Sequence, residues 1–95
     1  MAMLVGICQI ELHIPASQSL KSKRVVLKSL KTRIQNKFNV SIAEVDYNEK
    51  WQRSTLGISI VANERRFIDQ AVSQIMNLVE DNSDVVIIDH STEII

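Results

Sequence analysis

Seven lysines and arginines lie in the stretch SLKSKRVVLKSLKTRIQNKF, from Ser19 to Phe38, which contains no acidic residue. This clustering of basic residues is unusual because the whole chain has eleven basic and eleven acidic residues and a formal charge of zero. Basic side chains gathered on one surface can replace the counterions around a phosphate backbone without reading its sequence. The first chemistry to consider for this chain is therefore the binding of a polyanion.

A helix can place these charges on one surface. The apolar residues of the stretch fall within one arc of a helical wheel, which is the spacing of a helix packed on a core. They are Leu20, Leu27, Leu30, Ile34 and Phe38. Ser19 is the expected N-cap, and the pattern predicts a helix that runs to about Asn36.

The basic residues would follow the two edges of this apolar stripe. Lys23 lies nearer to the core than the others, so we expect its stem to follow apolar surface while its ammonium reaches water. Arg33 and Lys37 occupy one edge. The residues that we predict to contact phosphates are Lys21, Lys23, Arg24, Lys28 and Lys31.

The alternative is a basic surface that needs no partner. No Asp or Glu occurs between Glu11 and Glu44, so the helix cannot form ion pairs with itself, and its like charges repel by a few tenths of a kcal/mol per pair. Acidic groups of a second helix could neutralise the surface across space, or it could simply be solvated. The candidates for such neutralisation are Asp69, Glu80 and Asp81.

The rest of the chain supplies four strands and a second helix. Alternation of apolar and polar residues predicts strands with one buried face over Leu4–Ile14, Phe38–Tyr47 and Leu56–Ala62, and a last short strand over Val85–Ile88. Asn63 can cap the second helix, which ends at the polar break that begins at Glu80. This order predicts a single domain over residues 1–95, a ferredoxin-like βαββαβ sandwich of class α+β, with two helices on one face of a four-stranded antiparallel sheet.

The strand from Phe38 to Tyr47 is irregular, because its apolar phase slips between Ile42 and Val45. Either the residues of even number face the core, or Ala43 and the odd positions after it do. A bulge near Ala43 would allow both, and the pattern leaves the choice open.

Length and composition are those of one small globular domain. Hydrophobic residues make up 45% of the 95 residues and charged residues 23%, which excludes the composition of a disordered chain. No apolar run approaches the roughly 20 residues of a membrane span, and the start, MAMLVGICQIEL, lacks the features of a signal peptide. We expect a cytoplasmic protein without a membrane partner, in which Cys8 is a small buried hydrophobe.

Signals for catalysis are weak. The chain has no Gly-rich phosphate loop, no paired cysteine motif and no serine or cysteine with a base at a recognisable spacing, so we predict that it is not an enzyme and binds no cofactor. His13 and His90 could be drawn together with Glu11 and Asp89 as metal ligands, because the first and last strands of this fold are neighbours. Their spacing matches no known site, and we interpret the histidines as ordinary surface residues, with no metal bound.

The sheet face away from the helices offers a second candidate surface. Val5, Ile7 and Val61 would point outward there and could form a homodimer interface, or they could be scattered exposed aliphatics or lie under the chain's own tail. Outward positions such as Gln9 lack the aromatic residues on which RNA-recognition sheets stack bases. Trp51, in the connection between two strands, either covers the edge of the core, which we favour, or stands out as a partner anchor.

Three segments together carry a family resemblance: VGICQIELHIP, then SLKSKR, then KFNVSIAEVDYNEKWQRSTLGISIV. From about Val5 to Glu64 the chain resembles the bacterial YlxP-like domains of unknown function. The resemblance implies a ferredoxin-like fold and no established activity, in a family whose genes often lie beside those for translation initiation and ribosome maturation. One departure is Ser22, where the family often has an acidic residue, and we expect the helix start to lose one reciprocal hydrogen bond of a capping box.

These observations predict a small non-catalytic binding protein that is associated with RNA, above all with ribosomal RNA or the ribosome, through the basic face of the first helix. The neutral total charge argues for modest, salt-sensitive affinity. The alternative is a homodimeric structural or protein-interaction module that associates through the open face of the sheet.

Overall fold

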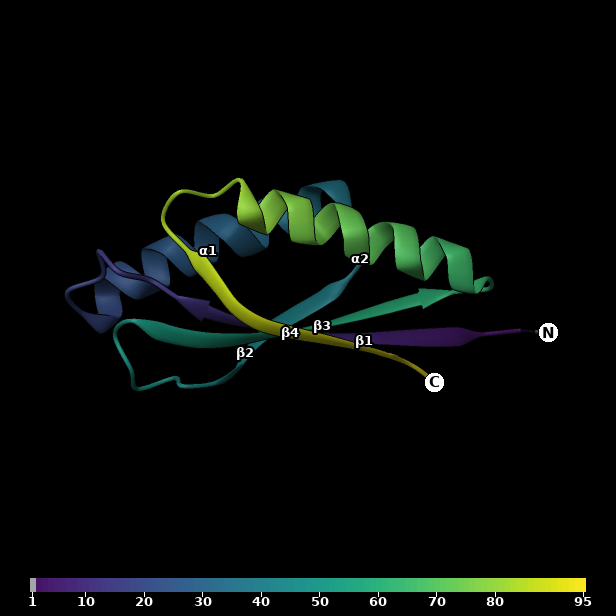
Figure 1. The fold of residues 1–95 in the computed structure, drawn as a ribbon, viewed down its shortest axis with the longest axis horizontal. Helices are drawn as coiled ribbons and strands as arrows, with labels where there is room; N and C mark the ends of the chain where they lie inside the picture. The colour runs from purple at the N-terminus through teal and green to yellow at the C-terminus, as the bar shows by residue number, and fades with distance from the viewer. Residues whose placement is uncertain (1) are drawn as a thin grey trace.

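The structure, a computed structural model, describes residues 2–95 and contains four strands and two helices (Figure 1). In chain order they are β1 (Leu4–His13), α1 (Leu20–Lys37), β2 (Ser41–Asp46), β3 (Arg53–Ala62), α2 (Arg65–Glu80) and β4 (Val86–Ile94). Neither helix is both long enough and apolar enough to cross a membrane. The predicted order of strand, helix, strand, strand, helix, strand is confirmed.

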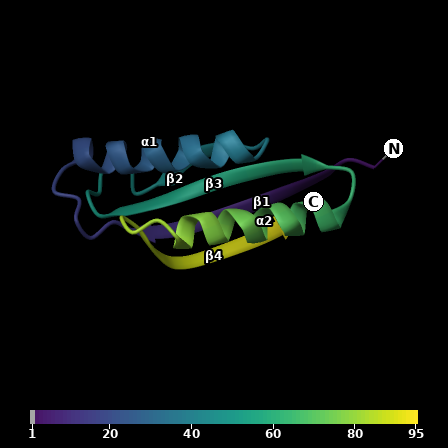
Figure 2. The ribbon, with the colours of Figure 1, turned by 90° about the horizontal axis from the view of Figure 1, so that it is seen from above.

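The four strands form one antiparallel sheet in the order β2-β3-β1-β4. Both helices cover the same face of the sheet and leave the other face open (Figure 1). Seen from above, α1 lies on the β2 side of the sheet and α2 on the β4 side (Figure 2). This is the predicted ferredoxin-like α+β sandwich.

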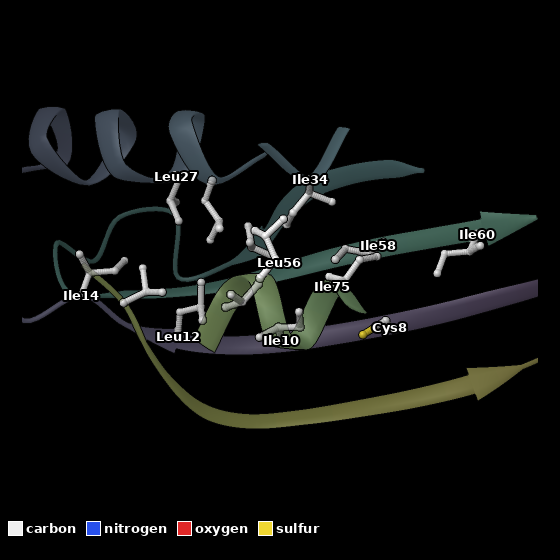
Figure 3. Close-up of a cluster of buried hydrophobic side chains, with 14 of the residues drawn as sticks. Cys8, Ile10, Leu12, Ile14, Leu27, Ile34, Leu56, Ile58, Ile60 and Ile75 are labelled. Atoms are coloured by element: carbon white, nitrogen blue, oxygen red, sulfur yellow. The ribbon is translucent and has the colours of Figure 1, made fainter. Parts of the chain in front are cut away.

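The core lies between the sheet and the helices (Figure 3). Alternate residues of the two central strands point into it, and they meet leucines and isoleucines from one side of each helix, as the periodicities of strand and helix require. The buried residues of β1 and β3 include Cys8, Ile10, Leu12, Leu56 and Ile58, as predicted. Gly6 belongs to the same layer, where a Cβ would collide with the Cγ2 atom of Ile68 on α2. A side chain at Gly6 would therefore force the helix away from the sheet.

The start of α1 contradicts the expected loss of a hydrogen bond. Ser19 is the N-cap, as predicted, and its hydroxyl accepts from the backbone N–H of Ser22 at 3.0 Å. The hydroxyl of Ser22 in turn accepts from the backbone N–H of Ser19 at 3.3 Å and from that of Gln18 at 3.1 Å. The capping box is complete, because a serine oxygen replaces the acidic side chain that the family often has there.

β2 contains the predicted irregularity, two residues later than expected. The pairing with β3 shifts between Glu44 and Asp46, so Val45 is the extra residue of a bulge. Before the bulge, Ile42 and Glu44 pair with Ile58 and Leu56 of the core face. The open choice between the two phases is thus resolved: the even residues face the helices up to Glu44, and after the bulge Asp46 pairs with Thr55 of the open face.

Two other boundaries were predicted wrongly. Glu64, not Asn63, is the N-cap of α2, and its side chain makes no capping hydrogen bond to the first turn of the helix. The last strand runs from Val86 to Ile94 and is much longer than the Val85–Ile88 predicted. Because β4 is an edge strand with most of its side chains exposed, its second half does not alternate in hydrophobicity and has no strand signal.

Candidate nucleic-acid interface

The α1 surface is the set of basic residues on this helix that point away from the core. Its members are Lys21, Arg24, Lys28, Arg33 and Lys37, which are exposed, and Lys31, which is half-buried. The helix rises about 1.5 Å per residue, so a row from Lys21 to Lys31 spans about 15 Å. The first turn carries no acidic residue. The helix therefore has six basic side chains that are at least partly exposed, on the two flanks of its apolar stripe.

These six charges have no carboxylate partner among residues 2–95. The three salt bridges of this part of the chain join Lys23 to Glu44, Arg53 to Glu11 and Arg66 to Glu64. Asp69, Glu80 and Asp81, the predicted candidates for neutralisation, form no ion pair within 4.0 Å with the helix. Asp81 does line a hollow with Arg33 and Lys37 at the end of α1, which places one negative charge near that pair.

Lys23 is the exception, and its predicted contact with phosphate is corrected. The side chain is only 1% exposed, and its Nζ atom lies 2.9 Å from Oε2 of Glu44. The ammonium also donates to three backbone carbonyls, those of Tyr47 at 2.9 Å, Asn48 at 3.3 Å and Arg53 at 3.2 Å. A buried ammonium requires such partners, so Lys23 fastens α1 to the β2–β3 connection and is unavailable to a polyanion.

Glu44 was missed by the sequence reasoning, although a signal was present. It has the same parity as Ile42 and therefore points to the helix side of β2, where an unpaired carboxylate would be costly. A carboxylate on the core face of a strand requires a basic partner. The position of Lys23, nearest to the core among the basic residues of its helix, indicated that partner.

The β2–β3 connection, residues 47–52, is held by further contacts. The side-chain amide of Gln52 donates to the backbone carbonyls of Pro15 at 3.1 Å and Ser17 at 3.2 Å. The backbone carbonyl of Gln52 accepts from the backbone N–H of Ile14 at 2.9 Å. Tyr47 has a positive φ of 61°, in the left-handed region that tight turns use. Trp51 is 55% exposed and is not one of the buried core residues, so the favoured prediction that it covers the core edge is not confirmed.

The open face of the sheet has an apolar end and a polar end. Val5 pairs with Val61 in the register of β1 and β3, and Ile7 follows on the same face. Val61 is 63% exposed and Ile7 36% exposed, and β4 continues beside β1, where Ile95 pairs with Val5. The tail thus lies next to these residues in the sheet. At the polar end, Arg53 forms its ion pair with Glu11.

The four residues that were considered as metal ligands and interpreted as ordinary surface residues do not form a metal site in the described residues 2–95. Glu11 and Asp89 do pair across β1 and β4, but His13 lies opposite Val86 and His90 opposite Ile10. Nδ1 of His13 lies 3.1 Å from the carbonyl oxygen of Gln52. In the described part of the chain no group of three or more His, Cys, Asp or Glu residues could hold a metal ion.

Cys8 lies in the core, 1% exposed. Burial raises the pKa of its thiol, more than a hydrogen bond with Thr92 lowers it. Because the thiolate is the reactive form, this environment suppresses nucleophilic chemistry.

The fold and the site together define a class of protein: a small α+β sandwich with an open sheet face and one cationic helix. A profile of the family described as "Protein of unknown function (DUF503)" matches residues 5–92. A protein of Bacillus subtilis (strain 168), "Uncharacterized protein YlxP", is 39% identical over 77 residues, which make up 81% of this chain and 84% of that protein. The chain belongs to the DUF503 family, and the resemblance to YlxP-like domains is confirmed.

One solved structure extends the comparison of folds. The de novo designed protein Foldit4 superposes with a TM-score of 0.56, over 98% of this chain and 96% of the designed chain, at 12% sequence identity. At this identity the likeness concerns the fold alone.

Proposed function

We propose that this protein is a non-catalytic, cytoplasmic binding protein that docks on RNA, with ribosomal RNA as its principal target, through the α1 surface. Lys21, Arg24, Lys28 and Lys31 contact phosphates in this proposal. The observation that carries it is the lack of any carboxylate within 4.0 Å of these side chains among residues 2–95. Folding gains nothing from such a row, because like charges along a helix repel.

The contrast with Lys23 supports a role outside folding for the remaining charges. Where the fold needs a cation, it buries the ammonium and provides Glu44 and three carbonyls. Among residues 2–95 the other basic residues of the helix have no carboxylate partner, so their charge is available to a polyanion. The gene context implied by the family resemblance favours RNA over DNA.

The neutral total charge sets the expected strength of binding. Eleven acidic residues lie elsewhere on the molecule, so long-range attraction is weak and affinity depends on local contacts. With about four phosphate contacts, the logarithm of the association constant should fall against the logarithm of salt concentration with a slope of about −3 for a single strand.

The test is charge reversal at two positions of the row. Arg24→Glu with Lys28→Glu should abolish co-sedimentation with ribosomes or total RNA at low salt, because two phosphate contacts become repulsive. The matched control is Arg65→Glu with Arg66→Glu at the start of α2, which changes the net charge equally. The two helices start at opposite ends of the molecule, so the control leaves the row intact (Figure 2). Unchanged co-sedimentation of the first variant at low salt would refute the proposal.

A second candidate function rests on the apolar end of the open sheet face. The paired valines Val5 and Val61, with Ile7 beside them, form a contiguous apolar patch that a second copy of the chain would cover. This homodimer should be visible in light scattering, and Ile7→Lys should give monomers, because a buried unpaired ammonium is unfavourable. A wild-type protein that stays monomeric at high concentration rules the dimer out.

A further inference from the structure

Trp51 is an exposed aromatic residue in a part of the chain that the fold holds in place. A tryptophan side chain has a large apolar surface and is stabilised by burial, yet Trp51 is 55% exposed and is not one of the buried core residues. It is also the single tryptophan of the sequence. The exposed part of this side chain could be covered by a ligand with an aromatic or apolar surface.

The backbone around Trp51 is fixed on both sides. Before it, the N–H of Lys50 donates to the carbonyl of Tyr47 at 2.9 Å, which closes a tight turn. After it, Gln52 donates through its side chain to the carbonyls of Pro15 and Ser17. The buried ammonium of Lys23 binds the carbonyls of Tyr47, Asn48 and Arg53. A ligand that stacks on the indole therefore has little backbone entropy to remove.

These contacts also connect Gln52, the residue after Trp51, to the first turn of α1. Gln52 reaches Ser17, whose hydroxyl lies 2.9 Å from that of Ser22 in the first turn of α1. The β2–β3 connection and the first turn of α1 lie at the same end of the molecule in both views (Figures 1 and 2). Lys21 and Arg24 are exposed at this end of the helix, and Lys50 is exposed next to Trp51.

We propose that Trp51 is a stacking site for an unpaired nucleobase, and that the ligand of this protein is a single-stranded segment of RNA. The inference rests on the proposed function, because the phosphates of the strand bind Lys21 and Arg24. An exposed indole on a held backbone, in a hollow with Lys50 and Arg53 and at the same end of the molecule as Lys21 and Arg24, has the two parts of a single-strand site, a stacking platform and a cationic track. In a duplex the bases are already stacked on each other, so a duplex can use only the α1 surface.

The experiment uses the full chain and two labelled RNA probes. One is an oligouridylate of about 12 nucleotides, within the usual range of single-strand sites, and the other is a hairpin duplex with the same number of phosphates. Fluorescence anisotropy of the label gives both affinities, and the emission of Trp51 is recorded in the same titrations. We expect the single strand to quench the emission and the duplex to leave it unchanged.

Substitution at Trp51 separates stacking from charge. Trp51→Ala should weaken binding of the single strand about tenfold and leave duplex binding and the salt slope unchanged, while Trp51→Phe should retain much of the affinity. Because Trp51 is not one of the buried core residues, both variants should have the same midpoint of urea unfolding as the wild type. An oligouridylate with abasic positions should bind the wild type as weakly as intact RNA binds Trp51→Ala.

Failure of this inference is distinguishable from failure of the proposed function. If both probes bind but Trp51→Ala changes neither affinity and the emission is not quenched, the stacking site is refuted and the α1 surface stands. If Trp51→Ala instead abolishes capture of a protein while RNA binding is unchanged, the indole is a protein anchor and the inference is overturned. If neither probe binds at low salt, the proposed function fails and the inference fails with it.

Discussion

The inner and outer sides of the first turns of α1 use the same residue types in opposite ways. On the inner side lies the Lys23 anchor, which we define as Lys23 with Glu44. The ammonium of Lys23 is buried there and donates to four oxygen atoms, one of Glu44 and three of the backbone. On the outer side, Lys21 and Arg24 are exposed and have no carboxylate within 4.0 Å among residues 2–95. The two regions are adjacent in sequence and differ only in the direction of their side chains.

This difference separates charges that the fold requires from charges that it does not. Lys23 joins the start of α1 to the β2–β3 connection, so removal of its ammonium takes a donor away from the Glu44 carboxylate and from three backbone carbonyls. Removal of an outer cation leaves no group unpaired and relieves repulsion along the helix. Stability and binding should therefore depend on different lysines of one helix.

The largest effect on stability is expected from Lys23→Met. The variant keeps the length of the side chain but leaves Glu44, 17% exposed, without its partner, and loss of one member of a buried pair typically costs about 3–5 kcal/mol. Urea unfolding followed by circular dichroism measures the change. Lys21→Met on the outer side is the matched control and should shift the free energy of unfolding by less than about 0.5 kcal/mol. Equal losses in the two variants would contradict the distinction.

A smaller loss is expected from Glu44→Gln. The amide oxygen can still accept from Lys23, and the ammonium keeps the carbonyls of Tyr47, Asn48 and Arg53, so we expect a loss of about 1–3 kcal/mol in the same urea experiment. The double variant Lys23→Met with Glu44→Gln should cost less than the sum of the single variants, because the two residues interact directly. Strict additivity would show that the pair is not coupled.

Ser22→Ala tests the capping box at the junction of the two regions. It removes an oxygen that accepts from two backbone N–H groups, and loss of such a contact typically costs about 1 kcal/mol. Ser29→Ala, at an exposed position within the same helix, is the control and should be neutral or slightly stabilising. A Ser22→Ala variant as stable as the wild type would mean that water replaces the serine oxygen without loss.

The smallest effect is expected from the outer cations. Arg24→Gln with Lys28→Gln should leave the free energy of unfolding within about 0.5 kcal/mol of the wild type, because both side chains are exposed and form no ion pair within the described part of the chain. The wild type should gain slightly in stability when salt is added, through screening of repulsion along α1, and the variant should gain less. A large loss in the variant would show that these charges serve the fold after all, and would remove the basis of the proposed function.

The periodicity of apolar residues along the chain predicted much of the fold. The even positions of β1 and β3 and the stripe of α1 predicted the core residues correctly, because a side chain's direction in a strand or helix follows from its position along the chain. The same reasoning placed the outer cations, whose exposure needs no tertiary contact. It failed for β4, an edge strand whose exposed second half is held by backbone hydrogen bonds to β1 and carries no hydrophobic alternation.

The sequence by itself thus determined the βαββαβ order, the buried faces and the row of cations along α1. The tertiary structure decided that Lys23 is buried against Glu44 and that Trp51 is held out from the core. The physical reason is that periodicity gives the direction of a side chain relative to its own strand or helix. The partner that it meets depends on how distant segments pack, and residues 23 and 44 come together only when α1 lies on the sheet beside β2.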